Sequence, residues 1–311
     1  AYYKLIHKMQ NVHCIVMTRN DDLIIEHWVK KHINVFDKIS VVDGSDGDFT
    51  QRVCEKYGIL YTKDPEPTEE KPFHEQYLRE AAFNLLKPYL TPGDWIACFM
   101  PDEWVYHDPR EIVDMVPGAF HNVIAWNQLN ILPHPSEKEE YLKSIEEGTY
   151  NPTEVFKHFW HRDNNKTCCE PRMFRYSGNE IWSHRLRWCD NKVAGRIQPL
   201  NKYNIAKIKP TYFHYKVFDL DPTKYKNDGF GHFKKSNLNT GIGYGYAMSE
   251  RKIESVKDLF FDEDNIYCNL GTDDDGGDYL HGYCVRIGDD GIIPEENYNT
   301  VGNDEDVRLI V

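Results

Sequence analysis

The N-terminal third of the chain alternates between continuous apolar runs and longer segments in which apolar residues recur every three or four positions. Continuous apolar runs are typical of strands buried on both faces of a parallel sheet, and the recurring spacing is typical of amphipathic helices. The predicted strands are Val12–Thr18, Lys38–Val42, Gly58–Thr62 and Trp95–Met100. The predicted helices are Leu23–Ile33, Thr50–Lys56 and Phe73–Leu86. This order predicts an α/β fold with a mostly parallel sheet, right-handed crossovers and flanking helices.

Capping and turn residues add detail to this prediction. The alternation of strands and helices fades after Asn130. Asp21 or Asp22 is expected to cap the first helix. The later predicted elements are helices at Arg110–Met115, Glu137–Glu147 and the start of Leu220–Asn227, and strands at Asn122–Leu129, Arg172–Phe174, Ile181–Trp188, Thr211–Val217 and Tyr283–Ile287. We expect residues 1–130 to form one α/β half, residues 131–256 to complete that domain irregularly, and residues 257–311 to form an acidic C-terminal extension.

Composition narrows the range of partners and compartments. The 311 residues include 50 acids against 37 Lys plus Arg, a net charge of −13, so a nucleic-acid partner is not expected. No apolar run approaches the ~20 residues of a membrane-spanning helix. The eight cysteines form no CxxC pair, and Cys14 and Cys98 fall in predicted buried strands, so we expect a reducing, cytoplasmic compartment. The chain begins at Ala1-Tyr2-Tyr3 without a secretory signal, which leaves room for an upstream segment.

A pair of acids follows the fourth predicted strand, in the stretch DWIACFMPDEWVY. Asp102 and Glu103 come directly after an apolar run, at the sheet edge where open α/β sheets bind ligands. Two adjacent carboxylates repel each other unless a cation or donor-rich ligand neutralises them. Hard oxygen ligands suit Mg²⁺ or Mn²⁺ carrying a phosphorylated substrate. The alternative is a strand end with two solvated acids.

The ordered motifs of residues 12–105 resemble family 2-like glycosyltransferases with the GT-A fold. The matching elements are Thr18-Arg19-Asn20, His32, Asp43, Ser45, Asp46 or Asp48, Thr50, and MPDEW in the place of the family's D-x-D-E-f element. A weaker likeness to the related family 92 branch lies in Val123–Asn127 and in His214-Tyr215-Lys216. The resemblance implies a Rossmann-like GT-A domain with an irregular C-terminal acceptor-side region.

The resemblance also implies roles for the first loops. Asp43 would accept a hydrogen bond from a uracil or guanine N–H, and Thr18 and Asn20 would hold the base or ribose. Arg19 would clamp a diphosphate, since guanidinium matches phosphate oxygens bidentately. The alternatives are a turn-forming Asp43 and a surface ion pair for Arg19. At the start of the third helix, His74 and Arg79 are placed to approach the diphosphate or donor sugar.

The candidate metal ligands depart from the family pattern. Met100 stands where the family has its first acid, which leaves Asp102 as the best ligand for Mn²⁺ or Mg²⁺. Glu103 is a further ligand candidate or orients a neighbouring loop. His214 is a candidate second metal contact, and Lys216 would add positive charge there.

The general base is not fixed by the sequence. The stretch from Glu170 through Arg185 resembles the family's p-R-l-F-R … v-H-E element, but Arg185 replaces the basic Glu and arginine cannot act as a base at neutral pH. His184, Asp190 and Glu180 remain, with Asp190 slightly favoured because a carboxylate suits the proton transfer. Inversion is expected, and retention stays open.

Together these features predict a metal-assisted glycosyltransferase that moves a sugar from a nucleotide sugar, a UDP-sugar by preference, to a hydroxyl of a glycan or glycoconjugate. Residues 1–130 would bind the nucleotide sugar, and residues 131–256 would build the acceptor side. A catalytically inactive glycan-binding module is the rival from another class, favoured by Met100 and Arg185. A sugar-phosphate nucleotidyltransferase is disfavoured, because no glycine-rich, Arg/Lys-bearing loop follows the first strand.

Overall fold

The computed structural model describes most of the N-terminal half of the chain and shorter parts of the rest. The described residues are 10–64, 75–116, 121–132, 134–162, 168–178, 181–182, 197–198, 206, 208, 210–215 and 282–288. The chain divides into two compact units. The first comprises Ala1–Gln128, Cys169–Tyr212 and Glu305–Val311, and the second comprises Leu129–Cys168 and Phe213–Asp304.

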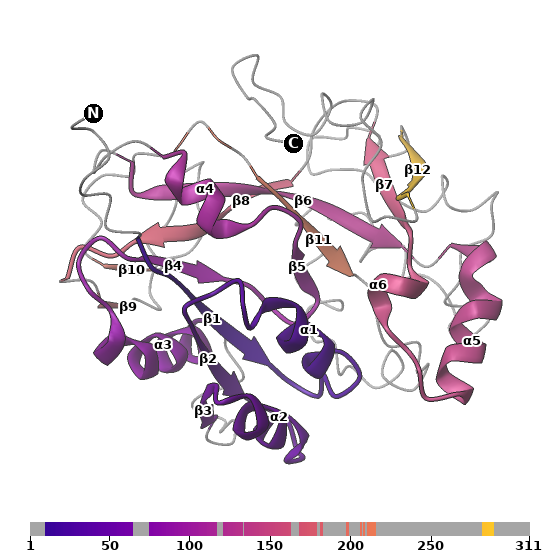
Figure 1. Cartoon of the computed structure of the whole chain (residues 1–311), viewed down its shortest axis with the longest axis horizontal. Coiled ribbons are helices and arrows are strands. Elements are labelled where there is room, and N and C mark those ends of the chain that lie inside the picture. The colour runs from indigo at the N-terminus through magenta and orange to yellow at the C-terminus, as the bar shows by residue number, and fades with distance from the viewer. Residues whose placement is uncertain are drawn as a thin grey trace, which may run out of the picture. The chain divides into compact units, whose positions relative to one another are not determined.

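The first unit is built on a mostly parallel sheet flanked by helices, as the sequence predicted (Figure 1). Its parallel strands are β1 (Val12–Thr18), β2 (Lys38–Asp43), β3 (Leu60–Lys63) and β4 (Trp95–Cys98). β8 (Cys168–Arg175) pairs antiparallel with β4, which gives the order β8-β4-β1-β2-β3. The parallel strands lie within two residues of their predicted bounds. β1, β2 and β4 are short, mainly apolar runs that the sheet buries, whereas β3 is only partly buried.

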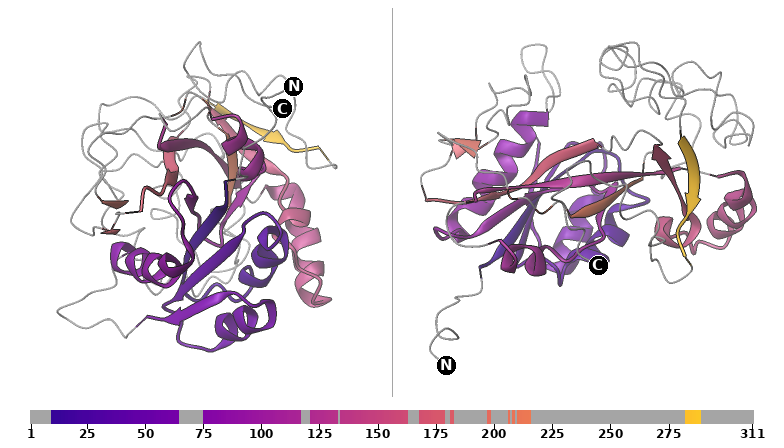
Figure 2. Two further views of the ribbon diagram at one scale, coloured as in Figure 1. Left: turned by 60° about the vertical axis from the view of Figure 1, so that its left-hand side comes forward. Right: turned by 90° about the horizontal axis from the view of Figure 1, so that it is seen from above.

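Helices cover both faces of this sheet. They are α1 (Ile25–His32), α2 (Phe49–Tyr57), α3 (Glu75–Leu86), the short η1 (Lys87–Tyr89) and α4 (Pro109–Asp114). The chain moves from β1 to β2 to β3 in one direction and returns past β1 to β4. Right-handed crossovers therefore place α1 and α2 on one face and α3 on the other (Figure 2). The reversal at β1 puts a topological switch point at the carboxyl ends of β1 and β4.

Each face has its own apolar core. On the α3 face, Phe83 and Leu78 pack with Ile15 of β1 and Ile96 of β4. On the other face, α1 buries Ile25, Trp28, Val29 and His32, which share one side of the helix. Cys14 and Cys98 are buried, as predicted, and form no disulfide.

The start of α1 differs from the prediction. Ile24 is the N-cap residue and no side chain caps the helix, so the expected cap by Asp21 or Asp22 is wrong. The Asp21 carboxylate turns back to the preceding loop instead, where it accepts hydrogen bonds from the Thr18 hydroxyl and the Arg19 amide. The backbone carbonyl of Asp21 accepts from the first amides of the helix.

Three further strands belong wholly or partly to the first unit. β6 (Val123–Leu132) and β11 (Thr211–Tyr215) match predicted strands, whereas β5 (Glu103–Val105) was not predicted. β11 pairs with both β5 and β6. A small sheet joins β9 (Ile181–Trp182) and β10 (Ile197–Gln198), and the rest of the predicted strand Ile181–Trp188 lies outside the described residues.

The second unit contains a helical segment and a strand pair. Its elements are η2 (Pro135–Glu137), α5 (Lys138–Glu146), α6 (Pro152–Val155), β7 (His158–Arg162) and β12 (Gly282–Arg286), with β7 and β12 antiparallel. The predicted helix near Leu220–Asn227 lies outside the described residues. Within the part of the chain that the structure describes, no helix combines the length and apolar character needed to span a membrane.

Candidate functional site

The candidate site begins where three parallel strands end side by side. Thr18 of β1 pairs in register with Asp43 of β2, and Asp43 pairs with Lys63 of β3. Because parallel strands share one direction, the loops that follow all leave from the same sheet edge. This is the edge at which open α/β sheets bind ligands.

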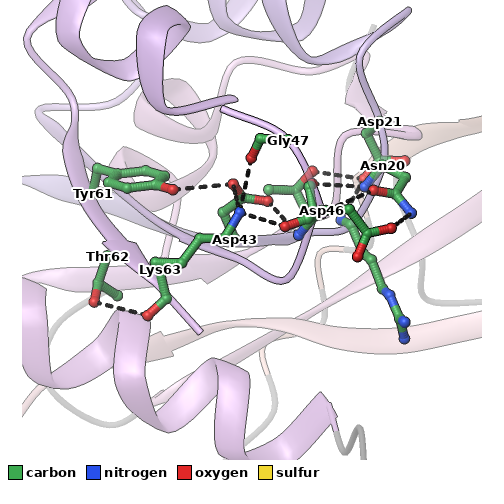
Figure 3. Close-up of polar contacts among 11 residues, drawn as sticks. Asn20, Asp21, Asp43, Asp46, Gly47, Tyr61, Thr62 and Lys63 are labelled. Atoms are coloured by element: carbon green, nitrogen blue, oxygen red, sulfur yellow. Dashed lines mark hydrogen bonds and ion pairs between the residues drawn. The ribbon is translucent and has the colours of Figure 1, made fainter. Parts of the chain in front are cut away.

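The turn after β1 and the loop after β2 are tied together through Asn20 (Figure 3). The Asn20 amide donates to Ser45 Oγ at 2.7 Å, and its side-chain oxygen accepts from the Asp46 amide at 3.1 Å. Asn20 Nδ2 donates to Asp46 Oδ2 at 3.5 Å. Asn20 has φ 57°, a left-handed conformation that asparagine tolerates better than most residues. These hydrogen bonds therefore fix the positions of the two loops relative to each other.

The Asp21 carboxylate stabilises the turn after β1. Its Oδ2 atom accepts from the Thr18 hydroxyl at 2.7 Å and from the Arg19 amide at 3.0 Å. The Thr18 hydroxyl is thus used inside the protein, with 3% of the residue exposed. The Arg19 and Asn20 side chains lie at the surface, where a ligand can reach them.

The Asp43 carboxylate is completely buried and makes three contacts. Oδ1 accepts from the Ser45 amide at 2.8 Å, as in an Asx turn. Oδ2 accepts from the Tyr61 hydroxyl at 3.1 Å and pairs with Lys63 Nζ at 3.4 Å. Burial and the negative charge of Asp43 raise the pKa of Tyr61, which keeps its hydroxyl protonated as a donor. In this structure Asp43 organises the loop after β2, which is one of the two roles expected for it.

The turn after β4 is held by a buried polar chain. Glu103 is fully buried, and its Oε2 accepts from the Met100 amide at 2.9 Å. Its Oε1 accepts from the guanidinium of Arg172 on β8. Arg172 also donates to the Tyr212 hydroxyl at 2.8 Å, which in turn donates to Gln128 Oε1 at 2.8 Å. With both oxygens engaged, Glu103 fits the orienting role better than that of a metal ligand.

His32, the histidine of the first motif, joins α1 to this same region. Its Nδ1 donates to the Trp28 carbonyl at 2.7 Å, and its Nε2 accepts from the Val105 amide at 3.3 Å. Burial lowers the pKa of His32 to about 3, so the ring is neutral. The indole of Trp28 donates to the Glu103 carbonyl at 2.8 Å. The motif histidine therefore positions β5, the strand that begins at Glu103.

Asp102 is the remaining carboxylate of the turn and is half-buried. Met100, which stands where the family has its first acid, packs its side chain against the α3-side core. A single carboxylate fits a divalent cation that takes its other ligands from diphosphate and water, as Mg²⁺ commonly does. Among the described residues, no group of three or more His, Cys, Asp or Glu side chains is arranged to hold a metal by itself.

The other predicted residues are more scattered. Arg79 is buried on α3, and His214 is buried on β11 within the second unit. The predicted residues His74, His184, Asp190 and Lys216 lie outside the described residues. The structure therefore brings together Thr18, Arg19, Asn20 and Asp43. It places Asp102 in the turn after β4, the strand beside β1, and Glu103 at the start of β5.

Sequence reasoning missed three residues of this region, namely Tyr61, Lys63 and Arg172. Tyr61 and Lys63 lie on β3, and their contacts with Asp43 follow from the register of β2 and β3. Arg172 is 69 residues from Glu103. No local pattern marks any of these pairings, and only the p-R-l-F-R likeness drew attention to the segment that contains Arg172.

Comparisons with known proteins find likeness only at the level of structure. No family model matches the sequence, and no curated protein matches it. Glucosyl-3-phosphoglycerate synthase from Mycobacterium tuberculosis, in complex with phosphoglyceric acid, is 14% identical with a TM-score of 0.27; the match covers 47% of this chain and 55% of that chain. This chain thus spans about half the length of that synthase.

Two other solved structures are similar to this chain at comparably low values. One is 4-diphosphocytidyl-2C-methyl-D-erythritol synthase, at 11% identity and a TM-score of 0.32, covering 54% of this chain and 76% of that chain. The other is a nucleotidyl transferase from Methanothermobacter thermautotroptrophicus, at 12% identity and a TM-score of 0.25, covering 39% and 62%. At these values the likeness concerns the α/β fold alone.

Proposed function

We propose that this chain is a glycosyltransferase of the GT-A type, which moves a sugar from a UDP-sugar to a hydroxyl of a glycan or glycoconjugate. The proposal rests on one observation, the linkage of the loops after β1 and β2 through Asn20 at the carboxyl edge of the parallel sheet. That edge is also the end of β4, from which the turn with Asp102 follows. A nucleotide at such an edge meets loop amides and polar side chains from several strands at once.

The described residues divide into two groups in this proposal. The loop organised by Asp43 and the surface side chain of Asn20 hold the nucleoside. The exposed guanidinium of Arg19 binds the diphosphate, since its planar fork matches two phosphate oxygens. Arg79 and His74 act from α3 and the segment before it on the diphosphate or the donor sugar.

Asp102 would hold a Mn²⁺ or Mg²⁺ ion in this arrangement. Such an ion supplies Lewis-acid stabilisation of the leaving diphosphate. Glu103 holds the turn through Arg172 and the Met100 amide, which fixes the backbone on which Asp102 lies. His214 and Lys216 remain candidates for a second contact with the ion or the diphosphate.

The acceptor hydroxyl needs a base in an inverting transfer. A base must lie within hydrogen-bond reach of the proton that it takes. Asp190 and His184 are the proposed candidates, with Asp190 preferred as a carboxylate.

Calorimetric titration with UDP and GDP, each with and without Mn²⁺, tests the proposal. We expect UDP to bind more tightly than GDP and its binding to strengthen with Mn²⁺. Asp102→Ala should abolish transfer and remove the Mn²⁺ dependence. Asp114→Ala, which removes an exposed carboxylate from α4, is the matched control and should leave both unchanged.

A glycan-binding module without transferase activity is the second candidate. The observation in its favour is Met100, whose side chain packs against the core where the family pattern has a metal-binding acid. Binding of glycans with no affinity for any nucleotide, with or without Mn²⁺, would favour this candidate over the glycosyltransferase.

A further inference from the structure

The ammonium group of Lys63 contacts three oxygen atoms. Lys63 is the last residue of β3, and its Nζ contacts Asp43 Oδ2 at 3.4 Å and the Gly47 carbonyl at 2.9 Å. The third contact is the carbonyl of Ser45. Figure 3 shows the Lys63 side chain reaching from β3 to the loop after β2. An ammonium has three N–H donors and no acceptor, so these three oxygens match its full bonding capacity.

The charge balance of the loop depends on this contact. The Asp43 side chain is 0% exposed, whereas that of Lys63 is 44% exposed. A buried carboxylate is costly unless it is paired and hydrogen-bonded, and breaking one partner of such a pair leaves the other charge uncompensated. Two backbone carbonyls point at the same ammonium and would repel the carboxylate and each other without it.

The same loop carries the link to the turn after β1. Ser45 gives its carbonyl to Lys63 while its hydroxyl accepts from the Asn20 amide. Asp46, between the two carbonyls that bind Lys63, exchanges hydrogen bonds with the Asn20 side chain. The position of Asn20 and the fold of the loop after β2 are therefore coupled through Ser45 and Asp46.

We propose that Lys63 is a positioning residue of the nucleotide site: its ammonium is the cation around which residues 44–48 fold, and nucleotide binding depends on that fold. This inference rests on the proposed function. Lys63 acts through the loop, because its three N–H groups match the three oxygen atoms of Asp43, Ser45 and Gly47 that it contacts.

Lys63→Ala combined with chemical rescue tests this role. The variant lacks a fragment that propylammonium matches in size and charge. We expect UDP to bind Lys63→Ala roughly tenfold more weakly or worse, as for the loss of hydrogen bonds to a charged group. Propylammonium should restore much of the affinity, whereas propanol and an equal concentration of sodium chloride should not.

Lys56→Ala is the matched control. Lys56 also forms a close ion pair, with Glu26 at 2.7 Å, but on the surface of α1 and α2. Its removal should change neither UDP affinity nor the response to propylammonium. Wild-type affinity in Lys63→Ala would overturn the proposal, and so would weakened binding that no alkylammonium restores.

Hydrogen exchange provides a readout that needs no nucleotide. The amides of Asn20 and Asp46 should exchange faster in Lys63→Ala and slow again with propylammonium. If wild-type protein binds no nucleotide, the proposed function fails, and exchange alone then decides whether Lys63 folds the loop. Unchanged exchange in the variant would overturn that part as well.

A measurement on the wild-type protein covers the case in which Lys63→Ala does not fold. Nitrogen-15 NMR of the lysine side chains should show a Lys63 ammonium whose protons exchange with water more slowly than those of Lys56. Equal exchange rates for the two ammonium groups would overturn the proposed role of Lys63.

Discussion

Asn20 and Asp46 form a reciprocal pair across two loops: the Asp46 amide donates to Asn20 Oδ1 at 3.1 Å, and Asn20 Nδ2 donates to Asp46 Oδ2 at 3.5 Å. The pair joins residues 26 positions apart in the sequence, each in the loop that follows a parallel strand. Asn20 has a positive φ of 57° in this position. One residue therefore combines a backbone requirement with a side-chain link, and substitutions can separate the two.

The first prediction separates these two contributions of Asn20. Asn20→Gly keeps the left-handed backbone accessible but removes the link to Asp46, so UDP should bind more weakly with little loss of stability. Asn20→Ala removes the link and adds a left-handed cost of about 1–2 kcal/mol. Urea denaturation and calorimetry on both variants check this. Equal stability of the two variants would contradict the backbone argument, and wild-type UDP affinity in Asn20→Gly would contradict the binding argument.

The second prediction concerns the buried pair Glu103–Arg172. Arg172→Met should destabilise the protein by about 3–5 kcal/mol, because it leaves a buried carboxylate without its cation. Glu103→Gln combined with Arg172→Met should be less destabilised than the sum of the single variants, since the orphaned charge is gone. A double-mutant cycle in urea measures the coupling. Additive effects would mean that the ion pair does not hold the turn after β4.

The third prediction concerns pH. Burial lowers the pKa of His32 to about 3, below its ordinary value of 6.5, so the folded protein keeps the ring neutral while the unfolded chain protonates it. The stability from His32 is therefore fully present above about pH 6.5 and is lost as pH falls toward 3. The slope approaches about 1.4 kcal/mol per pH unit within that window.

His32→Gln is the variant for this prediction. It should be less stable than the wild type at pH 7 and lose less stability between pH 7 and pH 5, as followed by urea midpoints. His13, whose pKa is also lowered by burial, contributes to both proteins and cancels in the comparison. Parallel stability curves for the two proteins would assign the acid sensitivity to other groups.

The fourth prediction concerns thiol reactivity. Burial, with the nearby charges of Asp43 and Glu55, raises the pKa of Cys54 to about 12. Burial also raises the pKa of Cys14. Since the thiolate is the reactive species, both thiols should resist iodoacetamide at pH 8 in the folded protein. Peptide mapping by mass spectrometry, with urea-unfolded protein as the control, measures the labelling. Rapid labelling of Cys54 in the native state would indicate that α2 opens locally.

The four parallel strands of the first unit could be predicted because their signal is local. β1, β2 and β4 are mainly apolar, and the alternation of strands with helices indicates a parallel sheet. The sequence did not predict β5 or β7, because neither strand carries a strong local signal. β5 is only three residues long, and the β7 segment His158–Arg162 carries polar residues at both ends, so neither stands out from its surroundings.

The candidate site could be predicted only in outline. The sequence placed Asp43 and Asp102 after strands, which required no knowledge of their partners. The contacts of Asp43 with Tyr61 and Lys63 depend on strand register, which a single residue of slip would change. The expected cap by Asp21 failed because a short acidic side chain before a helix can equally bond to the turn behind it, and here it does so.

The chain through Glu103, Arg172, Tyr212 and Gln128 has a consequence for how the protein is made. During synthesis the residues that link the first two loops, Asn20 and Ser45, leave the ribosome long before Arg172 and Tyr212. Until those later residues arrive, the carboxylate of Glu103 has no guanidinium to bind, and burying it is costly. The loops after β1 and β2 can therefore form on the nascent chain, whereas the turn that carries Asp102 reaches its final shape only after residues from the distant β8 and β11 have joined the sheet.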